Sequence, residues 1–132
     1  MSTAPGAGAV GAPQAPGDLP RAVATAPGGV VVLAAEDLGA ALGARATVVQ
    51  FSSTFCTPCR RTRLVVEHAL RSEPGVVHVE LDVADHLALG ERLDVTSTPT
   101  VLVLDVRGRV RRRAAGVPTL AQVRAALADA TA

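Results

Sequence analysis

The sequence predicts an α/β fold in which a central mixed sheet of about five strands is flanked by helices on both faces. Two observations lead to this prediction. Apolar runs of strand length alternate along the chain with segments whose apolar residues recur at helical spacing. The last two runs are separated only by the turn at Arg107 and Gly108, so they are expected to form an antiparallel hairpin. Alternating strands and helices favour parallel neighbours, and the hairpin makes the sheet mixed.

Length and composition indicate one domain behind an N-terminal tail. The chain has 132 residues, of which 48% are hydrophobic, and a net charge of +1, so no strong field would attract nucleic acid or an acidic membrane. Residues 1–27 are mostly Ala, Pro and Gly, and we predict a disordered tail there because such a segment buries little apolar surface. Residues 28–132 are expected to form the domain. The N-terminus lacks the basic region of a signal peptide, so we expect a cytoplasmic protein without a membrane segment.

The first half of the domain is expected to run strand, helix, strand, helix. The valine run at residues 30–34 predicts a short strand. Residues 36–42 predict a short helix, with acidic residues in its first turn and a stop at Gly43. The β-branched run at residues 47–51 predicts a buried central strand. A long helix is expected over residues 56–72.

The second half is expected to add three strands and two helices. Residues 76–83 predict a strand, and the leucines in residues 85–93 predict a helix. Residues 100–105 and 109–114 are the expected hairpin strands. Pro118 is expected to open the last helix, because proline suits the first helical position.

The only two cysteines, Cys56 and Cys59, lie at the start of the long helix. Free N–H groups and the helix dipole favour negative charge there, so a thiolate is stabilised. Two thiols at this spacing near a βαβ pattern indicate a redox-active pair. The alternatives are a structural turn or half of a zinc site. Since His68, His78 and His86 fall on different elements, no metal is expected.

Several separated features follow one another along the chain: Phe51 at the end of a strand, Cys56-Thr57-Pro58-Cys59, Thr98-Pro99-Thr100, Arg107-Gly108 and Gly116. Taken together, they resemble the thioredoxin family from about residue 30 to the C-terminus. The resemblance implies a thioredoxin fold and a thiol–disulfide oxidoreductase that reduces protein disulfides without a bound cofactor. It also implies an upstream thiol or flavoprotein reductase as partner, and we expect a monomer.

The resemblance implies a role for each residue of the site. Cys56 would be the nucleophile that forms a mixed disulfide with substrate, and Cys59 would resolve that intermediate, leaving a redox disulfide between the two. Pro99 would follow a cis peptide bond and lie against the cysteines. The residues expected to contact substrate are Phe55, Thr57, Pro58, Thr98 and Val117.

One position departs from the family pattern. Gln50 stands where thioredoxins usually carry a buried Asp, and glutamine cannot titrate. Glu80 falls where the family usually has the Lys that partners that Asp. Strand alternation places Glu80 on one face with His78 and Asp82. The hypothesis is therefore that Glu80 points under Cys59 and hydrogen-bonds Gln50, with a pKa raised by burial. The alternative is a solvated Glu80 at the strand surface.

Other interpretations remain open at the level of sequence. A redox-sensing or binding module, in which the disulfide switches an interaction without turnover, would use the same cysteines. A relative of the membrane-tethered disulfide reductases would need an N-terminal anchor, and we expect none in this sequence. The arginine run at residues 109–113 has no interleaved aromatic residues, so nucleic acid is not an expected partner.

Overall fold

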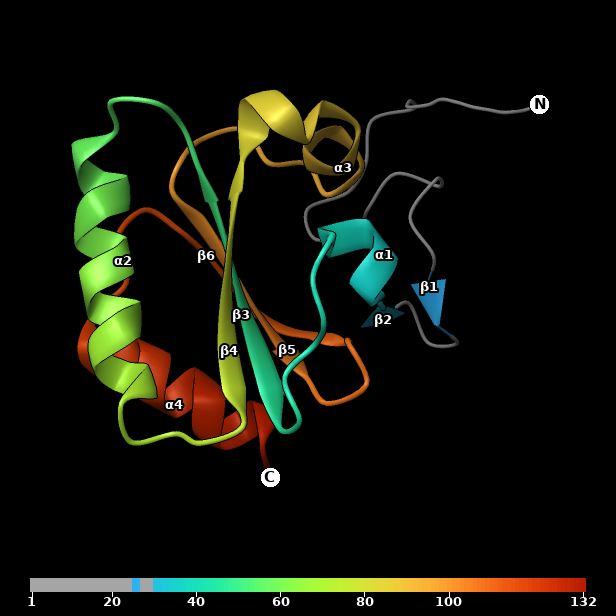
Figure 1. The fold of residues 1–132 in the computed structure, drawn as a ribbon, viewed down its shortest axis with the longest axis vertical. Coiled ribbons are helices and arrows are strands. Elements are labelled where there is room, and N and C mark those ends of the chain that lie inside the picture. Colours follow the sequence, from blue (N-terminus) through green and yellow to red (C-terminus); the bar gives the residue numbers. More distant parts are fainter. Residues whose placement is uncertain (1–24, 27–29) are drawn as a thin grey trace.

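The computed structural model describes residues 25–26 and 30–132. The tail expected over residues 1–27 therefore lies outside the described residues, apart from residues 25–26. At the centre is a mixed sheet in the order β4-β3-β5-β6, in which β3 and β4 are parallel and the other neighbours antiparallel (Figure 1). Its strands are β3 (Ala46–Ser52), β4 (Val76–Asp82), β5 (Thr100–Asp105) and β6 (Val110–Ala115).

The described central sheet has four strands, and the segment expected to supply a fifth lies apart from it. Strand β2 (Val30–Val31) pairs with β1 (Thr25–Ala26) in a separate ribbon. A single bridge between Val32 and Arg109 links this segment to the hairpin. The N–H of Leu33 then donates to the carbonyl of Gly108 at 2.9 Å, and helix begins two residues later, which leaves few residues for a longer strand.

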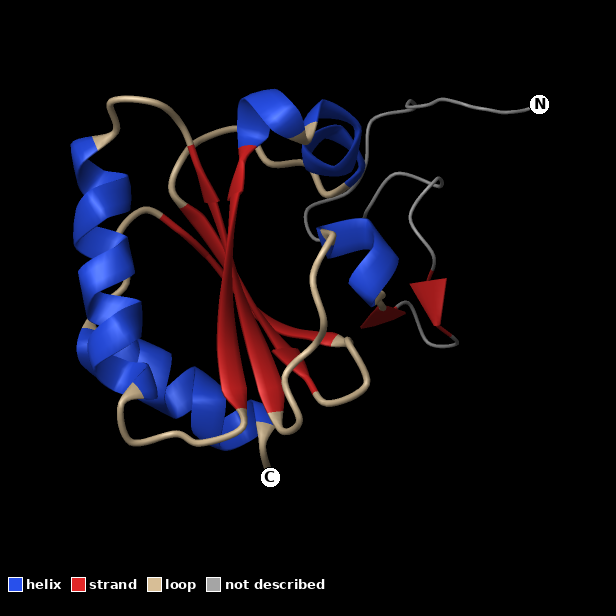
Figure 2. Ribbon diagram, in the orientation of Figure 1, coloured by secondary structure: helices blue, strands red, loops and turns tan. Residues whose placement is uncertain are grey.

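Helices cover both faces of the sheet, as predicted (Figure 2). Helices α2 (Thr57–Leu70) and α4 (Leu120–Ala130) pack on one face, while α1 (Ala35–Leu38) and α3 (Leu87–Arg92) pack on the other. The short 3-10 helix η1 (Val83–Asp85) joins β4 to α3. Alternate residues of β3 therefore enter two different apolar cores: Val48 faces α2 and α4, and Phe51 faces α1 and α3.

Two helix ends differ from the predictions. Helix α1 ends at Gly39, whose φ of 67° is left-handed, and does not extend to residue 42. Gly43 has another role: a Cβ there would lie 2.1 Å from the carbonyl oxygen of Ala46, so the close approach of two backbone segments requires glycine. Pro118 does not open α4, because Thr119 is the N-cap and its hydroxyl accepts from the N–H of Gln122 at 3.0 Å.

The arginine run on β6 is engaged in ion pairs. Asp105 is only 3% exposed and accepts from the Nε of Arg109 at 2.7 Å. Burial opposes ionisation of Asp105, but its hydrogen bonds to Arg109 hold its pKa below the ordinary value. Arg111 and Arg112 both meet Asp129, at 3.4 and 3.5 Å. These contacts explain the arginines structurally, since they stabilise the hairpin turn and join β6 to α4.

Candidate active site

The two cysteines are joined by a disulfide at the start of α2, with their Cα atoms 5.2 Å apart. Cys56 is the N-cap of the helix, and its Sγ accepts the backbone N–H of Cys59 at 3.1 Å. Pro58 occupies the first turn, where its missing N–H leaves no helical bond unmade. The Sγ of Cys56 therefore lies at the N-terminus of the helix. It accepts a hydrogen bond there, and the positive end of the helix dipole favours negative charge on it.

The two sulfurs differ in their access to solvent. Cys56 is half-buried, whereas Cys59 is only 1% exposed and lies in the core below the first turn. A substrate sulfur can approach Cys56 from outside, while Cys59 can be reached only from the side of its neighbour. This asymmetry is the one expected for a nucleophilic cysteine and a resolving cysteine.

The loop before β5 completes the surface around the disulfide. The peptide bond between Thr98 and Pro99 is cis, as predicted. The hydroxyl of Thr98 lies 3.9 Å from the Sγ of Cys56 and 2.8 Å from the hydroxyl of Ser53. The carbonyl of Pro99 accepts from the N–H of Gly116 at 2.8 Å, which brings Val117 beside this loop. The loop that carries Thr98 and Pro99 is thus held beside the Sγ of Cys56 and is bonded to the start of the loop after β6.

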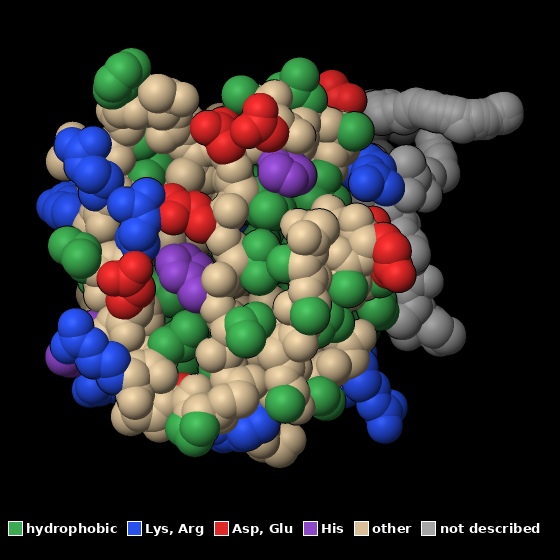
Figure 3. All heavy atoms as spheres, viewed as in Figure 1, with side chains coloured by type: hydrophobic (Ala, Val, Ile, Leu, Met, Phe, Trp, Pro, Cys, Tyr) green, Lys and Arg blue, Asp and Glu red, His purple; other side chains and the backbone are tan. Residues whose placement is uncertain are grey.

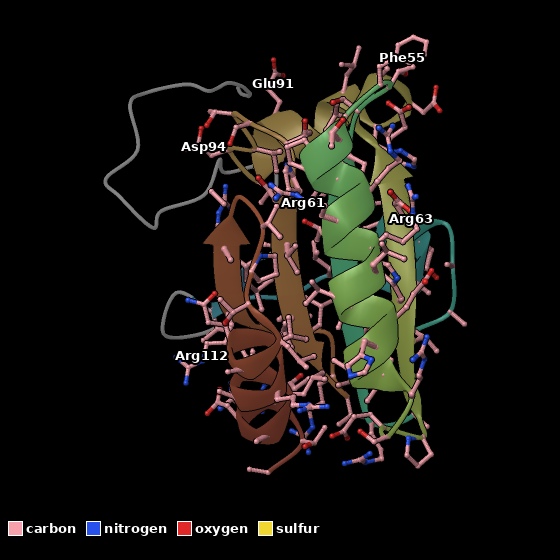
Figure 4. All side chains as sticks on the ribbon, turned by 90° about the vertical axis from the view of Figure 1, so that its left-hand side faces the viewer. Phe55, Arg61, Arg63, Glu91, Asp94 and Arg112 are labelled. Carbon is pink, nitrogen blue, oxygen red and sulfur yellow. A yellow bond between two sulfur atoms is a disulfide. The ribbon has the colours of Figure 1, made fainter. Side chains whose placement is uncertain are left out.

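Phe55 presents an aromatic ring directly before the nucleophile. Its side chain is 95% exposed, and Figure 4 shows it projecting at the tip of the molecule, above the start of α2. Its backbone has φ 58°, a left-handed conformation that costs a residue with a side chain free energy. Thr57 and Pro58, the next residues expected to contact substrate, are also exposed.

A polar network lies beneath Cys59, buried at Gln50 and Ser52 and open to solvent at Glu80. The parallel register places Gln50 of β3 opposite Glu80 of β4, on the face covered by α2. Gln50 is fully buried, and its Nε2 donates to the carbonyl of Cys59 at 2.8 Å. The hydroxyl of Ser52 donates to the carboxylate of Glu80 at 2.7 Å. The expected contact between Gln50 and Glu80 is present, but long at 3.5 Å.

The carboxylate of Glu80 is held by an arginine that sequence alternation does not reveal. Arg63 of α2 reaches across to β4 and binds both carboxylate oxygens, at 2.7 and 2.8 Å (Figure 4). This hydrogen bonding lowers the pKa of Glu80 below its ordinary value, and outweighs the burial that would raise it. The Glu80 side chain remains 26% exposed. The prediction of a raised pKa for Glu80 is therefore wrong.

The Arg63–Glu80 pair is expected to make the oxidised protein less stable in acid. The pKa of Glu80 in the folded chain lies below its ordinary value of 4.5, so as pH falls the unfolded chain takes up this proton first. The stabilisation is complete above the ordinary value and is lost as pH drops through the folded pKa. Urea unfolding between pH 3 and 7 should show this decline in the wild type.

In Glu80→Gln the decline should be shallower than in the wild type. Glu73→Gln is the matched control, because Glu73 also pairs with an arginine, Arg45, at 3.2 Å, and an ion pair at the surface contributes little to stability. Its decline should follow the wild type. Parallel curves for Glu80→Gln and the wild type would contradict the prediction.

The remaining surface features lie away from the cysteines. A hollow of about 350 Å³ lies between β6 and α4, and none of its lining residues belongs to the site described above.

Among residues 25–26 and 30–132, no group of three or more His, Cys, Asp or Glu side chains is placed to hold a metal ion. No helix in the described part of the chain is long and apolar enough to cross a membrane.

Comparison with known proteins shows which proteins this chain is similar to. The family model described as Thioredoxin matches residues 29–129. The thioredoxin of Ophiophagus hannah is 34% identical over 58 residues, which are 44% of this chain and 55% of that protein. The chain therefore spans about half the length of this curated relative. The X-ray structure of Fasciola hepatica thioredoxin superposes with a TM-score of 0.57 at 25% identity, covering 67% of this chain and 83% of the other. Oxidised mitochondrial thioredoxin 3 from Saccharomyces cerevisiae gives a TM-score of 0.57 at 21% identity, with 64% and 78% covered.

Proposed function

Since this chain belongs to the thioredoxin family, we propose that it is a thiol–disulfide oxidoreductase that reduces disulfides in protein substrates. The observation that carries this proposal is the asymmetric cysteine pair. Cys56 is reachable at the helix N-terminus, and Cys59 is buried and bonded to it. The expected thioredoxin fold agrees with the family match and with the superposed structures.

The reaction follows from the positions of the two sulfurs. In the reduced protein, the Cys56 thiolate attacks a substrate disulfide, forms a mixed disulfide and displaces one substrate thiolate, which takes up a proton. Cys59, losing its proton, then attacks the Sγ of Cys56 and releases the second substrate thiol. The cysteine pair gives two electrons and the substrate disulfide gains them. An upstream thiol or flavoprotein reductase returns the pair to the dithiol.

The groups around Cys56 favour the thiolate form. The N–H of Cys59 already points at the Sγ of Cys56 in the disulfide, and the hydroxyl of Thr98 lies on the same sulfur. Hydrogen bonds to a charged atom at a helix N-terminus are stronger than those to a neutral one. The same contacts therefore stabilise Cys56 more when it is reduced and ionised, which raises the fraction of Cys56 that is ready to attack a substrate disulfide.

The remaining site residues have supporting roles in this proposal. Glu80, ionised by its contact with Arg63, anchors the hydroxyl of Ser52 beneath Cys59 rather than acting as a base of raised pKa. Pro99 shapes the loop that faces the cysteines. The residues that contact substrate are Phe55, Thr57, Pro58, Thr98 and Val117. We place the protein in the cytoplasm, acting as a monomer.

Turnover tests this proposal against a module that only switches an interaction. Catalytic amounts of the full chain, with dithiothreitol as electron source, are expected to accelerate reduction of a disulfide-bonded test protein many-fold over dithiothreitol alone. The matched control is the same protein with both thiols alkylated after reduction, which should give the uncatalysed rate. A wild-type rate equal to that of the alkylated control would contradict the proposal and favour the switching module.

A further inference from the structure

The Gln50 amide connects the resolving cysteine to a histidine on the neighbouring strand. Gln50 has no solvent exposure, so its polar atoms must find partners within the protein. Its Nε2 donates to the carbonyl of Cys59 at 2.8 Å and to the hydroxyl of Ser52 at 3.0 Å. On the other side of the amide, the Oε1 lies 3.0 Å from the Nε2 of His78.

The donors and acceptors that are available fix the direction of each of these hydrogen bonds. The carbonyl of Cys59 can only accept, so the amide nitrogen of Gln50 must face it. The Oε1 of Gln50 then faces His78 and can only accept, so the Nε2 of His78 must carry a hydrogen. Both the neutral Nε2–H tautomer and the protonated imidazolium meet this requirement. The proton that His78 gains or loses is therefore the one on Nδ1, and the contact with Gln50 persists in both states.

Charged groups surround His78 on the elements packed against it. Arg63 and Glu67 act on it from α2, and Glu80 acts on it from its own strand. Burial lowers the pKa of His78 below 6.5, and the two glutamates partly oppose that effect. On the face shown in Figure 3, basic side chains gather over α2, with acidic and histidine side chains beside them toward the sheet.

We infer that His78 is a positioning residue for the reaction proposed above: through Gln50 it orients the backbone of Cys59, and its charge is coupled to the state of the cysteine pair. The inference rests on the proposed function. The arrangement depends on the amide, because an ionised carboxylate in place of Gln50 would present only acceptors to the carbonyl of Cys59. The amide supplies a donor on that side and an acceptor for His78 on the other.

Coupling between the two groups must be reciprocal. If the charge on His78 changes the ionisation or reactivity of the cysteines, the redox state of the cysteines must shift the protonation of His78 by the same factor. The reduced pair carries a thiolate that the disulfide lacks, and negative charge favours the imidazolium. The protonation midpoint of His78 should therefore be higher in the reduced protein than in the oxidised protein.

NMR titration of the wild-type histidine ring protons measures this directly. His68, in the last turn of α2 and thus at the opposite end of that helix from the cysteines, provides the reference signal in the same spectra. Equal midpoints for His78 in the two states would overturn the inference. This result is independent of the proposed function, because both redox states are prepared chemically. An inactive protein would contradict the function, and an active one with an unshifted His78 would contradict only the inference.

Two substitutions separate orientation from charge. His78→Gln keeps an N–H donor for Gln50 but cannot titrate, whereas His78→Leu loses both properties. At pH 8, His78→Leu should slow release of the mixed disulfide about fivefold or more, while His78→Gln stays within about twofold of wild type. His78→Gln should also lose the acid-side ionisation from the pH profile of release. Equal rates and pH profiles for both folded variants and the wild type would overturn the inference.

Discussion

Replacing Cys59 with serine is expected to stop turnover and to trap the substrate on Cys56. The variant keeps the Cys56 sulfur at the helix N-terminus, so the first attack proceeds and a mixed disulfide forms. No second sulfur then lies beneath it to release the substrate. Turnover of a disulfide-bonded test protein should fall to the rate of dithiothreitol alone. Mass spectrometry under non-reducing conditions should show one substrate chain bound to each enzyme chain.

Cys56→Ser is the matched control for this experiment. It should lose turnover equally but form almost no covalent complex, because the remaining Cys59 is only 1% exposed. The pair of variants therefore separates the two chemical roles, which a loss of turnover alone would not do. Equal trapping by the two variants, or trapping only by Cys56→Ser, would contradict the assignment of nucleophile and resolving cysteine.

Replacing Phe51 with alanine is expected to have the largest effect on stability. Phe51 is fully buried at the end of β3, and its ring packs among apolar side chains from α1, α3 and the sheet. Removing a buried phenylalanine costs about 3–5 kcal/mol, because transfer free energy is lost and a cavity remains. Domains of this size have about 5–15 kcal/mol in total, so urea unfolding of the oxidised protein should show a large loss.

Phe51→Leu tests whether the effect comes from lost volume. Leucine restores most of the apolar contact, so this variant should lose about 1–2 kcal/mol. The disulfide should still form in both variants, because Phe51 and Gln50 point to opposite faces of the sheet. A loss below about 1 kcal/mol in Phe51→Ala would show that the core collapses around the site at little cost.

The sequence predicted those parts of the fold in which several local signals agree. The hairpin, the buried strand that ends near Phe51, and the helix that begins at the cysteines are all present. The helix after residue 34 was placed less well, because Gly39 takes a left-handed conformation before the apolar pattern ends. The strand at the start of the domain is also shorter than expected. Its backbone bonds near Gly108 depend on a tertiary contact that local propensity does not contain.

The sequence predicted which residues form the candidate site better than it predicted the electrostatics of those residues. Alternation along β4 correctly placed Glu80 near Gln50. It did not identify Arg63, since tertiary packing decides which side chains of α2 reach β4. It also gave no role to His78, although strand alternation had placed that residue on the face shared with Glu80. The available signal for a role of His78 was a buried glutamine, Gln50, beside two titratable neighbours, His78 and Glu80.

In the proposed function Phe55 contacts substrate, so its left-handed backbone sets recognition against stability at this one residue. A glycine would take the same φ without strain, yet the chain keeps a large apolar ring there, in contact with water. The folded protein by itself gains little from that ring. A partner that covers it removes apolar area from solvent, a contribution of about 2–3 kcal/mol for a whole side chain. In the free chain the exposed Phe55 ring is therefore unfavourable, and binding of a partner removes this cost.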